Sequence, residues 1–276
     1  MKEKILYISD LDGTLLRTDQ TVSEFTARTV CSLVRRGMLF SYATARSYTT
    51  SSKVTKGLPE KLPVIVFNGS FIVETGTQRR LLSRVFTEDQ VSSILDFLIG
   101  RGLYPIVNAF FEDKEKFSYC RGKETKGVAR FIRERYEDVR RNPVALEKEL
   151  YKGEVFHITC IDEEEKLRLA YDEFKEKYPC VCYRDMYSGD MWLEIHPMGA
   201  TKANAVLALK EMLGCKRVVC FGDGENDLSM FAIADECYAV ANAHDALKAI
   251  ATSVIGSNEN DGVAVWLSQN AKFDEK

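Results

Sequence analysis

Apolar and polar positions follow two rhythms along the chain, one typical of buried strands and one typical of amphipathic helices. In the first part, apolar runs predict strands over 4–10, 38–46 and 62–70. Apolar residues at helical spacing predict a helix over 21–37, with Gly37 as its end. Strands that alternate with helices are the signature of a parallel sheet.

The same alternation returns in the last part of the chain. Its predicted elements are a helix over 201–214, a strand over 216–223, a helix over 226–234, a strand over 237–243, a helix over 244–251 and a strand over 253–257. The two parts together predict an α/β fold, a Rossmann-like core built on a parallel sheet.

The middle of the chain has a different order of elements, α-β-β-α-β-α-β-β, and begins with a Thr87–Gln90 capping box. Its predicted elements are a helix over 87–102, strands over 103–111 and 116–120, a helix over 125–136, a strand over 154–161, a helix over 163–178 and a hairpin over 180–195. This order predicts a separate α+β domain at 85–189, inserted into the parallel-sheet core formed by 1–84 and 190–276.

Composition is that of an ordinary globular protein. The 276 residues are 45% hydrophobic and 29% charged, and the net charge of −3 argues against general attraction to nucleic acid or anionic lipid. No apolar stretch reaches membrane-span length, and residues 1–10 lack the hydrophobic region of a signal peptide. We therefore expect a cytoplasmic protein with no membrane or nucleic-acid partner, and no obligate protein partner is evident.

Cysteine and histidine do not form a recognisable metal-binding pattern. The eight cysteines are scattered, and most lie in apolar runs where cysteine acts as a small hydrophobe. The three histidines, His157, His196 and His244, are well separated. We expect reduced cysteines and interpret His157 and His196 as packing or surface residues, with His244 near a helix start.

Polar residues follow the predicted strands of the sheet, at the edge where open parallel sheets bind ligands. These residues are Asp10 and Asp12, Thr44, Asn68, and Asp223 and Asp227, with Lys202 near the start of a following helix. Hard oxygen ligands without histidine or thiolate favour Mg²⁺. A carboxylate can attack phosphorus, and a second acid can move the proton, while hydroxyl, ammonium and backbone N–H groups hold phosphoryl oxygens.

Four short motifs make the chain resemble the haloacid dehalogenase superfamily, and most closely its Cof-like phosphatase branch with a large α/β cap. They are DLDGT at 10–14, YATARS at 42–47, GATKANAV around Lys202, and GDGENDLSM at 222–230. The ending NENDGVAVWL also resembles that branch. The resemblance covers nearly the whole chain and is weakest in the cap.

The resemblance implies a catalytic and metal-binding set. Asp10 would be the nucleophile and a metal ligand. Asp12 would be the general acid/base, with its backbone carbonyl facing the metal. Asp223 would coordinate Mg²⁺, and Asp227 would ligate or brace it.

The resemblance also implies a phosphate-binding set. Thr44 and Lys202 would bind phosphate, and Asn226 would reach the phosphate or its neighbour. Ala45 stands where the family usually has glycine; its N–H can face phosphate provided that its backbone is not left-handed.

Several of these residues have an ordinary structural reading when taken alone. Thr44 could cap a helix, Lys202 could lie on the surface, and Asn68 with Gly69 could form a tight turn. The hairpin at 183–191, with Tyr183, Arg184, Asp185 and Tyr187, is either an exposed turn or a substrate-selecting loop, and the two readings stay open.

The leading hypothesis is a Mg²⁺-dependent phosphatase for small phosphorylated metabolites, with an aspartyl-phosphate intermediate. The first alternative is a phosphotransferase such as a sugar-phosphate mutase. The second, from a different class, is a metabolite-binding regulator that keeps the fold without turnover. The sequence does not name the substrate.

Overall fold

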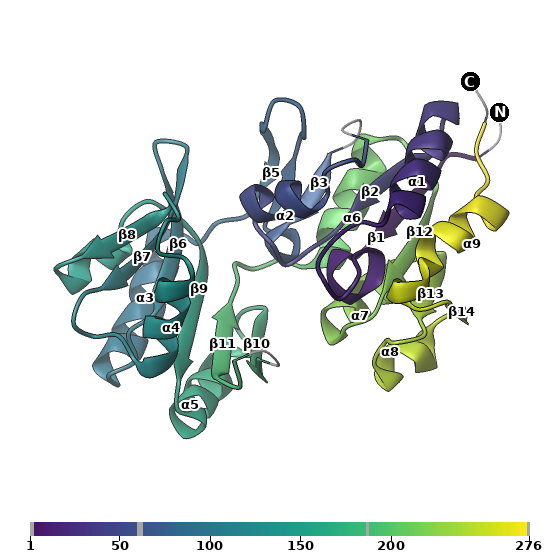
Figure 1. Cartoon of the computed structure of the whole chain (residues 1–276). Coiled ribbons are helices and arrows are strands. Elements are labelled where there is room, and N and C mark those ends of the chain that lie inside the picture. The colour runs from purple at the N-terminus through teal and green to yellow at the C-terminus, as the bar shows by residue number, and fades with distance from the viewer. Residues whose placement is uncertain (1–2, 60–62, 186–187, 275–276) are drawn as a thin grey trace. The chain divides into compact units, whose positions relative to one another are not determined.

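The computed structural model describes residues 3–59, 63–185 and 188–274, and the chain divides into two compact units (Figure 1). Unit 1 comprises residues 1–83 and 200–276, and unit 2 comprises residues 84–199. The return to unit 1 therefore falls later than the boundary predicted near residue 190, because the last strand of the hairpin belongs to the sheet of unit 2. Leu62, Met186 and Tyr187, which the sequence-based predictions included, lie outside the described residues.

Unit 1 contains a five-stranded parallel sheet in the order β14-β13-β12-β1-β2, which confirms the predicted Rossmann-like α/β core. Its strands are β1 (Ile5–Ser9), β2 (Leu39–Tyr42), β12 (Arg217–Gly222), β13 (Glu236–Val240) and β14 (Ser253–Ile255). Successive residues of β1 from Leu6 to Ser9 are all buried, so both faces of the sheet are covered.

Helices supply that cover, and they pack in pairs, α1 with α9 and α6 with α7 (Figure 1). The helices of unit 1 are α1 (Glu24–Arg36), α2 (Tyr48–Val54), α6 (Lys202–Met212), α7 (Leu228–Ile233), α8 (Asp245–Ile250) and α9 (Gly262–Asn270). The predicted end of α1 is confirmed, since Gly37 has a φ of 121° that favours glycine.

The strand predicted at 62–70 does not extend the parallel sheet as expected. Its ordered part, β3 (Val64–Val66), pairs antiparallel with β4 (Phe71–Val73), which pairs with β5 (Arg80–Ser83). A single parallel bridge between Ala43 and Ile65 links β3 to the end of β2. The sequence did not predict β4, β5 or α2, because these elements are short.

In its described residues, unit 2 is a six-stranded sheet in the order β10-β11-β9-β6-β7-β8 with three α-helices, the separate α+β unit that the middle of the sequence predicted. Its elements are α3 (Glu88–Gly100), β6 (Ile106–Phe111), β7 (Lys114–Cys120), α4 (Lys126–Glu134), β8 (Arg141–Val144), β9 (Glu154–Asp162), α5 (Glu164–Phe174), β10 (Cys180–Arg184) and β11 (Met191–Ile195). Thr87 and Gln90 form the predicted capping box of α3. Strand β8 was missed by the prediction.

Two further expectations can be compared with the structure. All eight cysteines are free, as predicted. In the part of the chain that the structure describes, no helix is long and apolar enough to cross a membrane.

Candidate active site

Two neighbouring parallel strands of unit 1 each end in an acidic residue. Asp10 directly follows β1, and Asp223 directly follows β12. The register pairs Ser9 with Phe221, and the Asp10 N–H donates to the Phe221 carbonyl at 2.9 Å. The parallel pairing therefore brings together two acids that are far apart in sequence, at the carboxyl edge where the pattern predicted them.

Lys202, the first residue of α6, lies against Asp10 and a further acid, Asp227. Its Nζ lies 2.7 Å from Oδ1 of Asp10 and 2.7 Å from Oδ1 of Asp227. The side chain is 1% exposed, which excludes the reading of Lys202 as a surface lysine. Burial alone would lower the pKa of the ammonium, but the two carboxylates raise it above its ordinary value, so Lys202 is charged.

The acids outnumber this cation. Burial raises the pKa of Asp10 well above its usual range, Lys202 opposes this shift, and the charges of Asp227 and Asp223 add to it. Burial also raises the pKa of Asp223 to about 6, against a hydrogen bond from Thr14. One ammonium among three close carboxylates leaves negative charge that a second cation would balance.

Asp227 braces the loop that carries Asp223. It is fully buried, and its Oδ2 accepts the N–H groups of Asp223 at 3.0 Å and Gly224 at 3.1 Å. A Cβ on Gly222 would lie 2.6 Å from the same Oδ2, so the motif needs glycine there. Both carboxylate oxygens of Asp227 therefore have partners within the protein.

The DLDGT segment supports Asp223 from the side of β1. The Thr14 hydroxyl donates to Oδ1 of Asp223 at 2.8 Å. Gly13 has a φ of 72°, and a Cβ there would lie 2.3 Å from Oδ2 of Asp223. The glycine and threonine of this motif thus fix the position of an acid that the other half of unit 1 supplies.

Asp12 has a different environment from Asp10. Its side chain is 48% exposed and is paired with Arg46, whose Nε donates to Oδ2 at 2.7 Å and whose Nη2 donates to Oδ1 at 2.5 Å. Arg46 also donates to the Gln20 side chain at 2.8 Å. Arg46 was not among the predicted site residues, although it ends the YATAR run of the second motif.

The second motif lies at the end of β2. Thr44 is fully buried, and its hydroxyl accepts the Arg46 N–H at 3.1 Å. Ala45 does not have a positive φ, so alanine in place of the family's usual glycine is unstrained.

Asn68 lies in a turn and also touches a predicted site residue. Phe67 and Asn68 both have a φ near 50°. The side-chain amide of Asn226 donates a hydrogen bond from Nδ2 to Oδ1 of Asn68 at 3.4 Å. A Cβ on Gly69 would lie 2.2 Å from the Thr201 carbonyl, so this turn approaches the start of α6 closely. The two readings of Asn68, as a turn residue and as a neighbour of the site, therefore hold together.

The residues present fit a hard divalent cation. Ligand oxygens of Asp10, Asp223 and Asp227 lie within 4.8 Å of one another. Carboxylate oxygens without sulfur or imidazole are the donors that Mg²⁺ prefers. Lys202 donates a hydrogen bond only to Oδ1 of Asp10, so Oδ2 has no hydrogen bond among the described residues.

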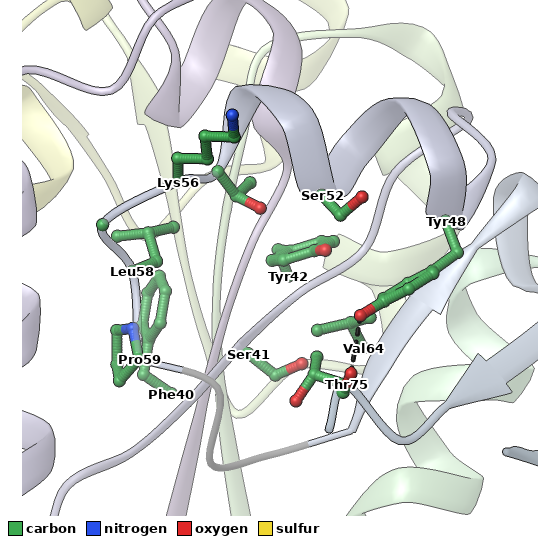
Figure 2. Close-up of a pocket in the computed structure, with 12 residues that line it drawn as sticks. Phe40, Ser41, Tyr42, Tyr48, Ser52, Lys56, Leu58, Pro59, Val64 and Thr75 are labelled. Atoms are coloured by element: carbon green, nitrogen blue, oxygen red, sulfur yellow. Dashed lines mark hydrogen bonds between the residues drawn. The ribbon is translucent and has the colours of Figure 1, made fainter. Parts of the chain in front are cut away.

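One hollow of unit 1 is not part of this cluster. It has a volume of about 170 Å³ and lies between β2, α2 and the following loop, lined by residues such as Tyr42, Tyr48 and Lys56 (Figure 2). The acids and Lys202 are absent from its lining. This hollow is therefore separate from the cluster of acids and Lys202.

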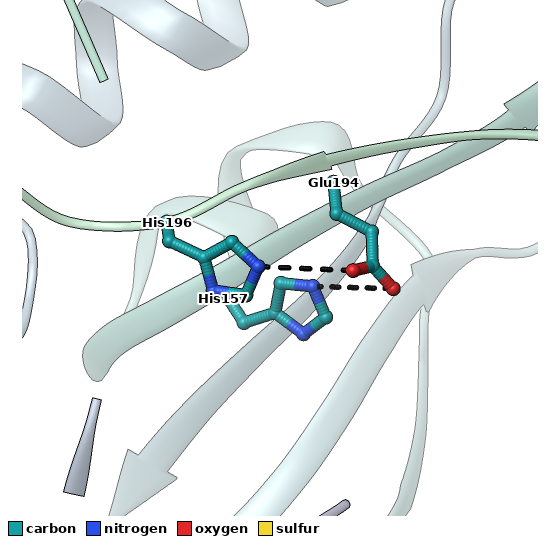
Figure 3. A group of neighbouring side chains, drawn as sticks. All are labelled: His157, Glu194 and His196. Carbon is teal, nitrogen blue, oxygen red and sulfur yellow. Dashed lines mark ion pairs between the residues drawn. The ribbon is translucent and has the colours of Figure 1, made fainter. Parts of the chain in front are cut away.

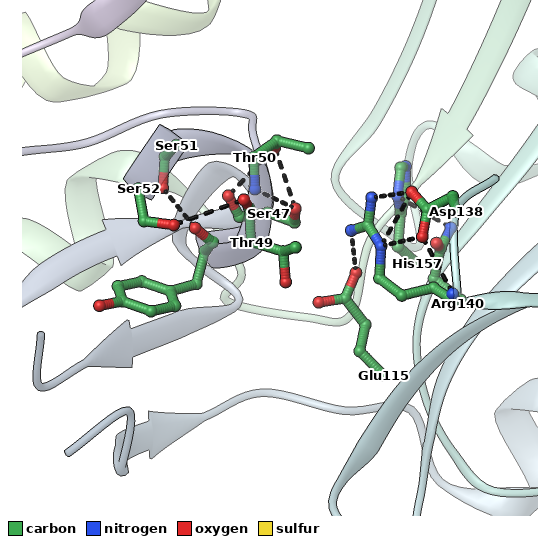
Figure 4. A network of polar contacts seen from close by, with 11 residues as sticks. Ser47, Thr49, Thr50, Ser51, Ser52, Glu115, Asp138, Arg140 and His157 are labelled. Atoms are coloured by element: carbon green, nitrogen blue, oxygen red, sulfur yellow. Dashed lines mark hydrogen bonds and ion pairs between the residues drawn. The ribbon is translucent and has the colours of Figure 1, made fainter. Parts of the chain in front are cut away.

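Two polar networks are built separately in the two units (Figure 4). In unit 1, Ser47 caps α2 by accepting the Thr50 N–H at 3.1 Å. In unit 2, Arg140 donates to Glu115 at 2.5 Å and to Asp138 at 2.6 Å. The named contacts satisfy buried polar groups within each unit, which is a structural role.

The predicted hairpin of unit 2 is held by its own unit. Arg184 donates to the Gly189 carbonyl at 2.9 Å and to Glu164 at 2.8 Å, and Asp185 accepts the Ser188 N–H at 2.7 Å. These contacts suit an ordinary turn, but they do not exclude a substrate-selecting loop. Both readings of the hairpin remain predictions.

Comparison with known proteins identifies the class. The family model for haloacid dehalogenase-like hydrolases matches residues 7–267, and the chain belongs to this family. It is 26% identical over 280 residues to the 5-amino-6-(5-phospho-D-ribitylamino)uracil phosphatase YwtE of Bacillus subtilis, covering 94% of this chain and 96% of that one. It is also 26% identical to YitU of the same organism, which carries the same phosphatase name, with 94% and 95% covered.

Solved structures have the same fold. The chain is similar to TM0651 from Thermotoga maritima, with a TM-score of 0.79, 23% identity and 99% of both chains covered. It is similar also to the sugar phosphatase BT4131 of subclass IIB, with a TM-score of 0.73, 20% identity, and 96% and 97% covered. The predicted membership of the haloacid dehalogenase superfamily and its Cof-like branch is confirmed, and the chain belongs to a family of hydrolases.

Proposed function

We propose that this protein is a Mg²⁺-dependent phosphatase that hydrolyses small phosphorylated metabolites through an aspartyl-phosphate intermediate. The observation that carries the proposal is the Asp10–Lys202–Asp227 cluster. In it the ammonium holds one oxygen of the buried Asp10 carboxylate, and the other has no hydrogen bond within the described part of the chain. That arrangement orients a nucleophile and places positive charge beside it.

Asp10 and Asp12 would carry out the two half-reactions. In the first, Asp10 Oδ2 attacks phosphorus and Asp12 donates a proton to the leaving oxygen. In the second, Asp12 takes a proton from water, which attacks phosphorus and frees the Asp10 carboxylate. Inorganic phosphate is the product.

The phosphoryl oxygens would be held by Lys202, Thr44 and the Ala45 N–H, with Asn226 beside them. These groups lie at the carboxyl edge of the sheet or at the start of α6. Phosphoryl transfer depends mainly on such positioning and charge neutralisation.

Asp10, Asp223 and the Asp12 backbone carbonyl would hold Mg²⁺, which when bound supplies positive charge to the phosphoryl oxygens. Asp227 would support them, since both of its oxygens already have partners.

The substrate is proposed at the level of its class. The names of the Bacillus relatives point to a phosphorylated ribityl compound, and that of one solved structure points to sugar phosphates. Unit 2 would act as the substrate-selecting cap, because the predicted site residues all lie in unit 1 and would contact mainly phosphate and metal.

The test is phosphate release from a panel of ribityl, flavin, pyridoxal, nucleotide and sugar phosphates, with Mg²⁺ and with excess chelator. We expect Mg²⁺-dependent release that D10N abolishes. Transfer of the phosphoryl group between substrate hydroxyls without release would instead identify a mutase. Substrate binding without release or transfer would identify a regulator.

A further inference from the structure

Two histidines and one glutamate that are separated in sequence come together on one face of the unit 2 sheet. β9 pairs antiparallel with β11, and the register opposes Ile158 to Ile195. Continuing that register by one residue places His196 beside His157, and Glu194 lies on the same face because side chains alternate along a strand. Figure 3 shows the three side chains converging.

The three side chains have the spacing of a ligand set. Nε2 of His157 lies 3.8 Å from Oε1 of Glu194, and Nε2 of His196 lies 3.7 Å from Oε2. One ligand atom from each residue lies within 4.8 Å of the others. Both N···O distances exceed an ordinary hydrogen bond.

The burial of this cluster needs an explanation. His196 is 2% exposed, and neither of its ring nitrogens has a hydrogen-bond partner among the described residues. Its ring stacks on that of His157 with centroids 4.5 Å apart, so two imidazoles face one carboxylate. Buried polar nitrogens are normally paired, which makes the cluster incomplete as it stands.

We propose that His157, Glu194 and His196 form a second metal site, which binds a divalent transition-metal ion of the Zn²⁺ type. Two imidazole nitrogens and a carboxylate with an open fourth position are a common Zn²⁺ donor set. Bonds of about 2.0–2.1 Å in tetrahedral geometry separate ligand atoms by about 3.3 Å. The two N···O distances exceed that value by about 0.4–0.5 Å. Because the two imidazole rings stack with an interplanar angle of 9°, they must turn for both Nε2 atoms to face one ion.

The neighbourhood suits a metal-bound imidazole. Asn108, which opposes His157 in the sheet, lies with Nδ2 3.4 Å from Nδ1 of His157. Turning this amide by 180° places its oxygen there, where it accepts Nδ1–H and directs Nε2 to the metal. The Thr159 hydroxyl, which lies 3.2 Å from the same Nε2, must turn away when the metal binds. The Tyr183 hydroxyl donates to Oε1 of Glu194 at 3.3 Å and orients the carboxylate.

The two sites differ in chemistry and so are expected to differ in metal. Imidazole favours Zn²⁺, Cu²⁺ and Ni²⁺ over Mg²⁺, whereas the Asp10 cluster offers only oxygen. The second site lies entirely in unit 2 and does not depend on the proposed function. A metal there ties the end of β11 to β9 and stabilises that unit.

The test measures, by equilibrium dialysis, how much Zn²⁺ and Co²⁺ the full-length protein binds. Excess Mg²⁺ is present to fill the site at the Asp10 cluster. We expect one Zn²⁺ per chain, an intense visible spectrum of four-coordinate Co²⁺, and a higher melting temperature with Zn²⁺. His157→Gln and His196→Gln should lose all three. His244→Gln is the matched control, since His244 is the remaining histidine of the chain.

Asn108→Ala tests the site without removing any of the three ligands, so it remains informative if a histidine variant fails to fold. We expect it to lower Zn²⁺ affinity by about 10- to 100-fold, as for other groups that orient a ligand. Stoichiometric binding that persists in both folded histidine variants would overturn the proposal, and so would a folded wild type that binds no Zn²⁺. A thiolate-type Co²⁺ spectrum that Cys180→Ser or Cys182→Ser removes would do the same by assigning the metal to cysteine.

Discussion

Arg46 holds the carboxylate of Asp12 with a two-pronged ion pair, Nε to Oδ2 at 2.7 Å and Nη2 to Oδ1 at 2.5 Å. Asp12 is half exposed, whereas Asp10, two residues earlier, is buried against Lys202. Two acids of one motif are thus held by two different cations. We infer that Arg46 positions the proposed acid/base, Asp12, and that Lys202 positions the proposed nucleophile, Asp10.

Replacing Arg46 tests that positioning role. Arg46→Ala should lower kcat by about 10- to 100-fold, since a misplacement of about 1 Å costs that much. Stability should change by less than about 1 kcal/mol, because exposed ion pairs contribute little. Arg46→Lys keeps the charge but loses the planar fork, so it should not restore kcat. A wild-type kcat in Arg46→Ala, measured with urea unfolding alongside, would show that Asp12 needs no such support.

Asp10→Asn separates chemistry from folding. The amide keeps the shape of the side chain, removes the nucleophile and relieves repulsion from Asp223 and Asp227, so turnover should vanish while the melting temperature stays close to wild type. Asp12→Asn should slow the reaction by about 10²- to 10⁴-fold. Phosphate release by both variants, with circular dichroism as the folding control, checks this; near-normal release by Asp10→Asn contradicts the mechanism.

The sequence predicted the elements whose signals are local. The apolar runs of β1 and β12, the Gly37 end of α1 and the Thr87–Gln90 capping box are each determined by neighbouring residues. Strand β8 was missed because Arg141, Asn142 and Pro143 have low strand propensity. It forms at the sheet edge through pairing with β7, which a local pattern does not reveal.

The candidate site was likewise predictable in part. Its motifs predicted that acids and Lys202 would gather at one sheet edge, since parallel strands share that edge. The partner of each side chain was not predictable, because Lys202 and Asp10 are 192 residues apart and their contact depends on tertiary packing. Likewise, His157 and His196 were expected to be packing or surface residues, and only the β9–β11 register brings them to Glu194.

Lys202→Met tests the charge balance of the buried cluster. It keeps a long side chain but leaves the carboxylates of Asp10 and Asp227 without their ammonium, so the free energy of unfolding should fall by about 3–5 kcal/mol. Mg²⁺ should restore part of that loss, since it supplies positive charge at the same acids. Lys210→Met, on the same helix but with a looser 3.7 Å pair to Asp235, is the control and should change stability by less than about 1 kcal/mol. Equal losses in the two variants under urea unfolding would refute the charge-balance account.

Thr14→Val tests whether Asp223 is oriented for a metal. The valine keeps the volume but removes the 2.8 Å hydrogen bond to Oδ1 of Asp223, so the carboxylate loses a group that fixes its direction. The Mg²⁺ concentration that gives half-maximal activity should rise by about 10- to 100-fold. Thr26→Val is the matched control, because Thr26 is as buried and donates to a different acid, Asp261, at 3.1 Å. Both variants should lose about 1 kcal/mol of stability for the missing hydrogen bond. Only Thr14→Val should change the Mg²⁺ requirement, and Thr14→Ser, which keeps the hydroxyl, should have the wild-type requirement. An unchanged Mg²⁺ titration in Thr14→Val would remove Asp223 from the proposed metal ligands.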